Sequence, residues 1–238
     1  MRVLDSGKQS AQENMSLDVR LLEQLSPQDQ PILHLYEWKQ PSLTYGYFIA
    51  LDKYLDLKKL KEKGIGAARR PTGGGIVFHL WDLAFSFLMP AGHQDFFDNP
   101  LKNYQFVNQI ILKTLEKLIA QPGFFKTEKQ LSGGALELKA QNPLAFCMAR
   151  PSKYDLIFQG KKAAGAAQRK KKNGYLHQGT IALVLPDEKM LFELLLDNKL
   201  AQAILDESFF LSEELQDLEA VRTELKKVLI SQFEKTLQ

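Results

Sequence analysis

RRPTGGGIVFH, from Arg69 to His79, is the most informative stretch of the chain. Its three glycines, Gly73, Gly74 and Gly75, carry no Cβ, so the backbone can adopt positive φ and another group can approach its N–H donors closely. The apolar residues that follow predict a buried strand at 76–78. Two arginines beside bare backbone suit a carboxylate, a phosphate or a polar acyl head group. A tight turn with solvated arginines is the competing interpretation.

The run matches neither of the common phosphate-binding glycine motifs. No Gly-Lys-Ser/Thr follows the glycines, so this is not a Walker A loop. The Gly-x-Gly-x-x-Gly spacing of dinucleotide-binding proteins is also absent.

The composition is typical of a globular protein. The chain has 238 residues, of which 45% are hydrophobic and 25% charged, and its net charge of +3 is too small to indicate a nucleic-acid partner. No apolar run approaches the ~18 residues of a membrane span, and Met1–Asn14 does not resemble a signal peptide. Cys147 is the single cysteine, which excludes an intramolecular disulfide and a cysteine-cluster metal site. We expect a cytoplasmic protein with no metal site and no membrane partner.

Short strands and amphipathic helices alternate along the first half. Residues 1–13 are expected to fray, Asn14 is the expected N-cap of a helix that ends at Leu25, and a strand at 83–88 is expected to pair with 76–78. The other expected elements are strands at 32–38 and 42–48 and helices at 55–63 and 103–120.

The second half contains two strand-like runs that flank the turn at 170–174, and this pattern predicts a β-hairpin. Small residues dominate 163–167, which leaves room for a ligand or allows two layers to pack closely. Lys162 opens this strand, where its charge can hold a carbonyl or phosphate oxygen or stay solvated. A strand at 156–158 precedes the hairpin, and helices near 187–196 and 213–237 follow it.

The run at 69–79 resembles the Arg-Arg-x-x-Gly-Gly-Gly-x-Val-Phe/Tyr-His signature of the biotin/lipoate protein ligase family. The family's Asn-Met-x-x-Asp pattern is matched at 14–18, and its Trp, Pro-Ser/Thr-x-Ser/Thr-x-Gly pattern at 38–46. Its second motif, Gly-x-Lys-x-x-Gly-x-Ala-Gln and then His-Gly-Thr/Ser, is matched by Gly160, Lys162, Gly165, Ala167, Gln168, Gly179 and Thr180. One departure concerns the histidine, because Gln178 precedes the glycine and His177 lies one residue earlier. On a strand this shift points His177 to the opposite face.

The resemblance implies an α+β fold with a mixed, largely antiparallel sheet flanked by helices, like the class II biotin/lipoate ligase catalytic domain. It implies one catalytic domain over 1–238, without a large C-terminal accessory domain. By the same analogy Lys162 holds the acyl carbonyl or the acyl-adenylate. His79 either contacts the ligand or acceptor or, as a lone histidine at a strand end, has a structural role. The implied substrate-binding residues are Arg69, Arg70, Gly73, Gly74, Gly75, His79, Gly165, Ala167, Gly179 and Thr180.

Two chemistries occur in this family, and Cys147 bears on the choice. In isolation a single cysteine is usually an inert buried residue. However, the Cys-x-x-x-Pro-Ser-x-Tyr-Asp pattern at 147–155 resembles the segment around the catalytic cysteine of cysteine-dependent octanoyltransferases and amidotransferases. Arg150, Lys153 and Lys162 would supply positive potential that favours a nucleophilic thiolate. We therefore favour transfer of an octanoyl or lipoyl group through a thioester on Cys147, with Cys147 and Lys162 as the catalytic residues and no cofactor.

The first alternative is an ATP-dependent lipoate–protein ligase that uses ATP and Mg and forms a lipoyl-adenylate. The second is a non-catalytic half of a split ligase. The expected partners are lipoyl-domain proteins (2-oxoacid dehydrogenase subunits and the glycine cleavage H protein) and an acyl carrier protein as donor. We expect a monomer. The basic turn at 170–172 either meets an acidic lipoyl domain or is a solvated hairpin tip.

Overall fold

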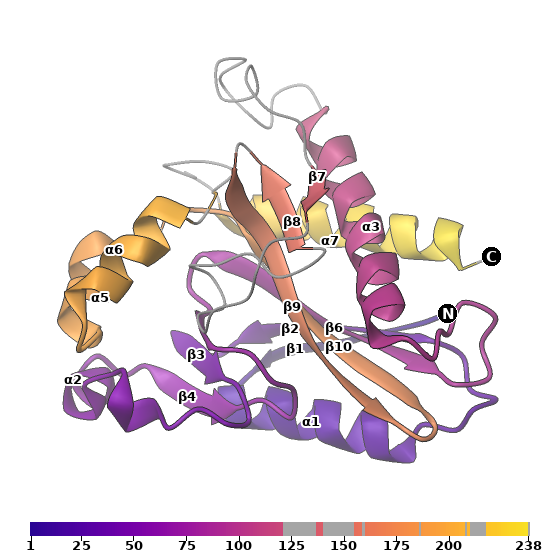
Figure 1. The fold of residues 1–238 in the computed structure, drawn as a ribbon, viewed down its shortest axis with the longest axis horizontal. Coiled ribbons are helices and arrows are strands. Elements are labelled where there is room, and N and C mark those ends of the chain that lie inside the picture. The colour runs from indigo at the N-terminus through magenta and orange to yellow at the C-terminus, as the bar shows by residue number, and fades with distance from the viewer. Residues whose placement is uncertain are drawn as a thin grey trace.

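The computed structural model describes residues 1–120, 137–139, 155–158, 160–185, 187–207, 209 and 218–237 (Figure 1). Its elements, in chain order, are β1 (Arg2–Gln9), α1 (Ala11–Gln24), β2 (Ile32–Trp38), β3 (Ser42–Tyr45), η1 (Leu51–Lys53), α2 (Leu57–Glu62), β4 (Gly66–Arg69), β5 (Ile76–Phe78), β6 (Asp82–Pro90), α3 (Pro100–Ile119), β7 (Glu137–Lys139), β8 (Asp155–Phe158), β9 (Lys161–Lys171), β10 (Gly174–Ala182), α5 (Glu188–Leu194), α6 (Asn198–Glu207) and α7 (Leu218–Thr236).

Two sheets organise the described residues. The larger has seven strands in the order β1-β2-β6-β10-β9-β8-β7, and the smaller has three in the order β4-β3-β5. The β1–β2 and β3–β4 pairs are parallel, whereas the other pairs are antiparallel. This arrangement confirms the predicted mixed, largely antiparallel sheet with flanking helices.

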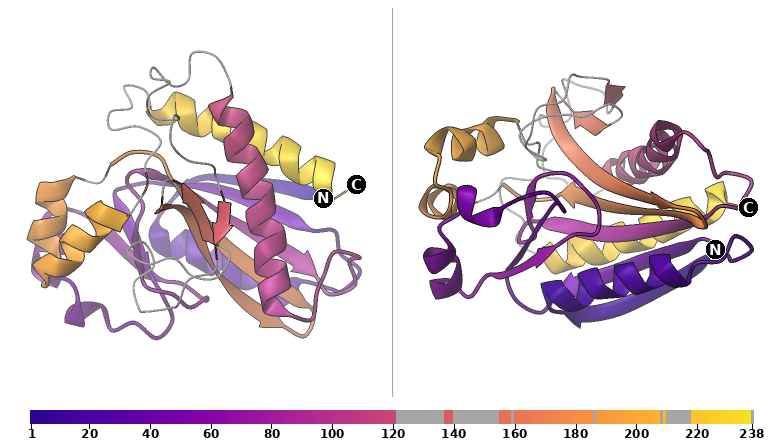
Figure 2. Two further views of the ribbon diagram at one scale, coloured as in Figure 1. Left: turned by 45° about the horizontal axis from the view of Figure 1, so that its top comes forward. Right: turned by 60° about the horizontal axis from the view of Figure 1, so that its bottom comes forward.

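The central strands of the large sheet are buried on both sides, because helices cover both of its faces. Successive side chains of a strand point to opposite faces. On β10, Tyr175 and Ile181 pack in the core formed with α3 and α7, whereas Leu176 packs in the core formed with α1. Figure 2 shows α1 on one side of the strands and α3 on the other.

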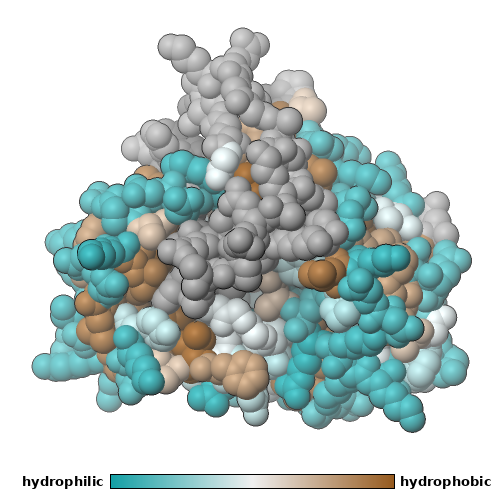
Figure 3. All heavy atoms as spheres, in the orientation of Figure 1, coloured by the Kyte–Doolittle hydropathy of each residue, from teal (hydrophilic) through white to brown (hydrophobic). Residues whose placement is uncertain are grey.

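A second apolar core joins the small sheet to the helices at one end of the molecule. Leu43 of β3, Leu60 of α2, Leu191 of α5 and Ile204 of α6 belong to it. These helices lie at the left in Figure 1, and α1 packs against both β4 and β10, so it links the two sheets. The space-filling view shows hydrophobic atoms between hydrophilic ones over this end (Figure 3). Among the described residues, every helix is too short or too polar to cross a bilayer.

The expectation for the N-terminus was wrong. Residues 1–13 do not fray, because β1 pairs in parallel with β2 at the sheet edge. The helix begins at Ala11 rather than after Asn14, since Ser10 and Glu13 form a capping box. Asn14 is instead buried, and its Nδ2 donates to the Glu37 carbonyl oxygen at 3.0 Å.

The expected pairing of strand 83–88 with 76–78 was also wrong. The strand at 76–78 is β5, which pairs with β3, whereas β6 pairs with β2 and β10. The glycine loop turns β5 back onto β3, and the Gly46 N–H donates to the Gly75 carbonyl oxygen at 3.1 Å. A Cβ on Gly46 would lie 1.9 Å from the Gly74 carbonyl oxygen, so only glycine permits this approach. The predicted strand at 32–38, the helix near 103–120 and the hairpin are confirmed.

Candidate acyl-binding site

A cavity of about 30 Å³ lies between the glycine-loop strands and the β9–β10 hairpin. Its walls come from α1, β2, β3, β5, β9, β10 and the loop after β4, and most of the predicted site residues line it. The residues that line it are Met15, Tyr36, Thr44, Arg70, Val77, His79, Lys162, Gly165, Ala166, Ala167, Gln178, Gly179 and Thr180. A cavity of this volume holds about two water molecules, so an acyl chain enters only if lining side chains move aside.

Lys162 is the charged centre of this cavity. Its side chain is 3% exposed, and its Nζ lies 2.6 Å from Oδ2 of Asp155, whose side chain is fully buried. The Tyr104 hydroxyl donates to the other oxygen of Asp155 and accepts from the Ala166 N–H at 3.0 Å. Because a buried charge is costly unless it is paired, Asp155 and Tyr104 are what allow an ammonium group to stay here.

A bulge in β9 aims Lys162 into the cavity. Between Ala164 and Lys162, two steps along β9 correspond to one step along β8, so Ala163 is an extra residue. Ala163 and Ala164 both pack in the core beneath α3. Lys162 and Gly165, an odd number of residues apart, therefore face the same cavity, which a regular strand would not allow.

Gly165 supplies the space that Lys162 occupies. A Cβ on Gly165 would lie 2.3 Å from Cε and 2.7 Å from Nζ of Lys162. The small residues of this strand thus make room for a side chain of the protein as well as for a ligand.

Arg70 shapes the glycine loop from inside. It is 6% exposed, and its Nη2 donates to the carbonyl oxygens of Gly73 at 3.1 Å and Gly75 at 2.7 Å. Gly74 is exposed and has a positive φ of 86°. Arg69 does not line the cavity, because its exposed guanidinium lies over the Tyr45 ring, 5.7 Å from the centroid. The two arginines therefore occupy different environments, and only Arg70 reaches the cavity.

A chain of hydrogen bonds runs from Arg70 to Asp82 along one wall. Arg70 Nη1 donates to the Thr44 hydroxyl at 2.8 Å, and this hydroxyl lies 2.8 Å from Nε2 of His79. His79 Nδ1 lies 2.7 Å from Oδ2 of Asp82, which also accepts from the Thr180 hydroxyl. The chain fixes the ring of His79, since Asp82 accepts at Nδ1 and Thr44 bonds the opposite nitrogen.

Gln178 occupies the position of the histidine in the second motif quoted above. Its Oε1 accepts from the Thr72 hydroxyl at 2.7 Å, and its Nε2 donates to Oδ2 of Asp18 at 2.6 Å. These bonds tie the glycine loop to α1 across β10.

His177 points to the opposite face, as expected. It lies 2.9 Å from Gln168 through Nδ1 and stacks against Phe85, and its Nε2 has no partner among the described residues. Burial lowers the pKa of His177 from 6.5 to about 3, because the charged ring would lose its hydration. The ring is therefore neutral and takes no part in the cavity.

The predicted nucleophile lies outside the described residues. Cys147, and with it Arg150 and Lys153, falls within 140–154, so its distance from Lys162 is not part of the description.

Sequence reasoning did not assign Asp155, Tyr104, Asp82 or Gln178 to the site. Asp155 was in the cysteine-segment pattern and Gln178 in the departure from the family motif, yet neither signal indicated a buried partner. The side chains that support Lys162 and His79 come from elements far apart in the chain, which local patterns do not relate.

The arrangement suits an uncharged polar group attached to an apolar chain. A buried ammonium can stabilise negative charge that develops on a carbonyl oxygen. Besides the polar side chains already described, the walls are formed by Tyr36, Val77, alanines, glycines and the flexible side chain of Met15.

Residues 10–234 match the lipoyl protein ligase A/B catalytic domain family, and the chain belongs to this family. The predicted resemblance is therefore confirmed.

Curated relatives of this chain include octanoyltransferases. The chain is 34% identical to octanoyltransferase LipM of Anoxybacillus flavithermus, over 99% of this chain and 86% of the relative. It is 33% identical to octanoyltransferase LipM of Bacillus subtilis, over 82% of this chain and 69% of the relative.

Solved structures share the fold. A lipoate-protein ligase A bound with ATP superposes with a TM-score of 0.71 at 25% identity, over 99% of this chain and 85% of the other. A putative lipoate protein ligase from T. acidophilum gives a TM-score of 0.72 at 25% identity, over the same shares of the two chains.

Proposed function

We propose that this protein is an octanoyltransferase that transfers an octanoyl or lipoyl group to the acceptor lysine of lipoyl domains, through a thioester on Cys147. The proposal rests on the buried Lys162, held by Asp155 over Gly165 in a cavity whose walls combine small and apolar residues with polar side chains. Membership of the family and the identity of its octanoyltransferase relatives support the acyl-transfer chemistry.

In the first half-reaction the Cys147 thiolate attacks the thioester carbonyl of an acyl carrier protein. The new carbon–sulfur bond to Cys147 forms, the carrier's carbon–sulfur bond breaks, and the carrier leaves as a thiolate that takes up a proton from solvent. The Lys162 ammonium stabilises the negative charge on the carbonyl oxygen during the attack. Asp155 acts as a positioning residue that keeps the ammonium in the cavity.

In the second half-reaction the neutral amine of an acceptor lysine attacks the acyl group on Cys147. An amide forms, the thiolate is released, and the amine's extra proton passes to solvent. This transfer requires neither ATP nor Mg, because the acyl group arrives already activated as a thioester. The acceptors would be lipoyl-domain proteins, namely 2-oxoacid dehydrogenase subunits and the glycine cleavage H protein.

The test is to mix the purified protein with octanoyl–carrier protein, without ATP, and to measure its intact mass. We expect a gain of one octanoyl group, its loss in Cys147→Ala, and loading slowed at least tenfold in Lys162→Met. Lys161→Met is the matched control, because Lys161 is the exposed neighbour on the same strand. No mass gain, together with pyrophosphate release from lipoate and ATP, would make the protein an ATP-dependent ligase and refute the thioester route.

A further inference from the structure

The turn at residues 79–82 joins the two sheets beside the acyl-binding cavity, because β5 belongs to the small sheet and β6 to the large one. His79 and Asp82 lie at the two ends of this turn, and their side chains bond each other at 2.7 Å. His79 also bonds Thr44 of the small sheet, whereas Asp82 accepts from Thr180 of the large sheet. Both threonines line the cavity. The position of the turn therefore determines how the walls from the two sheets meet.

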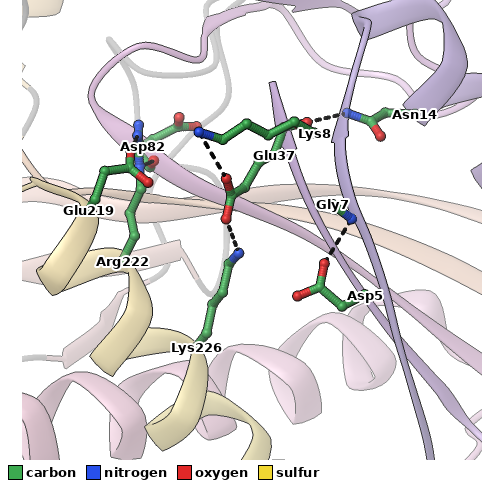
Figure 4. A network of polar contacts seen from close by, with 9 residues as sticks. All are labelled: Asp5, Gly7, Lys8, Asn14, Glu37, Asp82, Glu219, Arg222 and Lys226. Atoms are coloured by element: carbon green, nitrogen blue, oxygen red, sulfur yellow. Dashed lines mark hydrogen bonds and ion pairs between the residues drawn. The ribbon is translucent and has the colours of Figure 1, made fainter. Parts of the chain in front are cut away.

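Arg222 of α7 holds this turn through backbone carbonyl groups. Its Nε donates to the Asp82 carbonyl oxygen at 3.0 Å, and its Nη2 donates to the Leu80 carbonyl oxygen at 3.1 Å. Its Nη1 pairs with Glu219 on the same helix at 2.7 Å, as Figure 4 shows beside Asp82. The side chain of Arg222 is only 16% exposed, so water competes little for these bonds. A planar guanidinium bridges two acceptors in a fixed geometry, which an ammonium group cannot do.

The carbonyl oxygen between these two is bonded as well. That of Trp81 accepts from the N–H groups of Leu183 and Val184, at 2.9 and 3.1 Å, just after the end of β10. The carbonyl groups of residues 80, 81 and 82 thus all have donors, and none of these donors lines the acyl-binding cavity. Groups outside the cavity therefore hold the turn in place.

Lys226 ties the same helix to the large sheet at a different point. Its Nζ lies 2.5 Å from Oε1 of Glu37 in β2, and Lys8 of β1 lies 3.8 Å from the other oxygen of this carboxylate (Figure 4). Within the described part of the chain, Lys226 makes no hydrogen bond to the turn at 79–82. The attachment of α7 in general can therefore be separated from the contact that Arg222 makes.

We propose that Arg222 is a positioning residue for acyl transfer, which fixes the turn between the sheets and, through it, the side of the cavity formed by His79 and Thr180. The inference rests on the proposed function and adds to it a residue of α7 that lies outside the cavity. Without the guanidinium the turn can shift, and a displacement of about 1 Å in a substrate-positioning group can slow a reaction by about 100-fold.

The experiment is chemical rescue of octanoyl loading, measured by intact mass in single turnovers. Arg222 and Glu219 line a cavity of about 270 Å³, so an added guanidinium ion can enter the space that Arg222→Ala leaves. Methylammonium supplies the same charge without the planar set of donors. Lys226→Ala is the matched control, because it loosens α7 from the sheet without touching the turn. Circular dichroism at each ion concentration checks that the proteins stay folded.

We expect Arg222→Ala to load at least tenfold more slowly than the wild type, and guanidinium to restore at least half of the rate. Methylammonium should restore none of it. Lys226→Ala should load within twofold of the wild type and should not respond to either ion. Arg222→Lys keeps the charge but bonds one carbonyl oxygen at a time, so it should load at least threefold more slowly, and it decides the matter if Arg222→Ala does not fold.

A second measurement requires no substrate. The Nδ1 proton of His79, held by Asp82, gives a downfield proton NMR signal that is assigned by its loss in His79→Gln. This signal should shift or disappear in Arg222→Ala, return with guanidinium, and stay unchanged in Lys226→Ala. The measurement follows the turn directly, because a general loss of stability would not move the signal of the folded protein.

Loading at the wild-type rate in both Arg222 variants would overturn the inference and leave the proposed function standing. An unchanged His79 signal in Arg222→Ala, or equal restoration by guanidinium and methylammonium, would overturn it in the same way. A wild-type protein that takes up no octanoyl group would instead refute the proposed function, and the inference with it.

Discussion

Replacing Gly165 with alanine tests whether Lys162 needs the bare backbone beneath it. The new Cβ would lie 2.3 Å from Lys162 Cε and 2.7 Å from Nζ, far inside van der Waals contact. The ammonium must therefore move by about 1 Å, away from an ion pair that is 2.6 Å long with Asp155. At an effective dielectric constant of about 20 this displacement weakens the attraction by about 2 kcal/mol. The same displacement moves the ammonium away from the developing oxyanion, and a loss of about 2 kcal/mol there should slow octanoyl loading by about 30-fold.

The assay is the rate of octanoyl loading in a single turnover, with urea unfolding measured in parallel. Stability should fall by only about 1 kcal/mol, because alanine restricts the unfolded chain more than glycine and offsets part of the loss. Gly66→Ala is the matched control on another strand, since its Cβ would meet the end of the exposed Gln40 side chain at 2.8 Å and the Ser42 hydroxyl at 3.2 Å, and neither group belongs to the cavity. Loading at the wild-type rate in Gly165→Ala would refute the reasoning that this glycine positions Lys162.

Three further predictions concern stability and the loop. Lys162→Met should lower the free energy of unfolding in urea by about 3–5 kcal/mol, because it removes the ammonium from beside the buried Asp155 carboxylate. Adding Asp155→Leu should restore the stability but not the activity. A loss below about 1 kcal/mol in Lys162→Met would contradict the idea that Asp155 needs the ammonium. Burial lowers the pKa of His177 from 6.5 to about 3, so only the unfolded chain binds a proton at this ring as the pH falls from about 7.5 to about 5.0. The free energy of unfolding should therefore fall by about 2 kcal/mol more in the wild type than in His177→Leu over this pH range. Equal losses in the two proteins would exclude this role. Gly46→Ala, with its Cβ 1.9 Å from the Gly74 carbonyl oxygen, should slow octanoyl loading at least tenfold, and an unchanged rate would show that the glycine loop tolerates displacement.

Local sequence patterns predicted the structure correctly where all the residues of the pattern belong to one element or to two neighbouring strands. Strand-like runs indicated β2 and, with the turn between them, the β9–β10 hairpin, and apolar spacing indicated α3. The two glycine-containing motifs indicated the family. The period of a strand also predicted that His177 faces away from the cavity. These features depend on near neighbours in the chain, so one sequence contains them.

The tertiary structure decided which strands pair and which side chains meet. Nothing in the residues 76–78 distinguishes β3 from β6 as a partner, because both present suitable apolar strands. Nor does spacing along β9 reveal that a bulge brings Lys162 over Gly165. Asp155 becomes the partner of Lys162 only because β8 lies beside β9. A buried charge is stabilised by groups that surround it in space, and folding determines which groups those are.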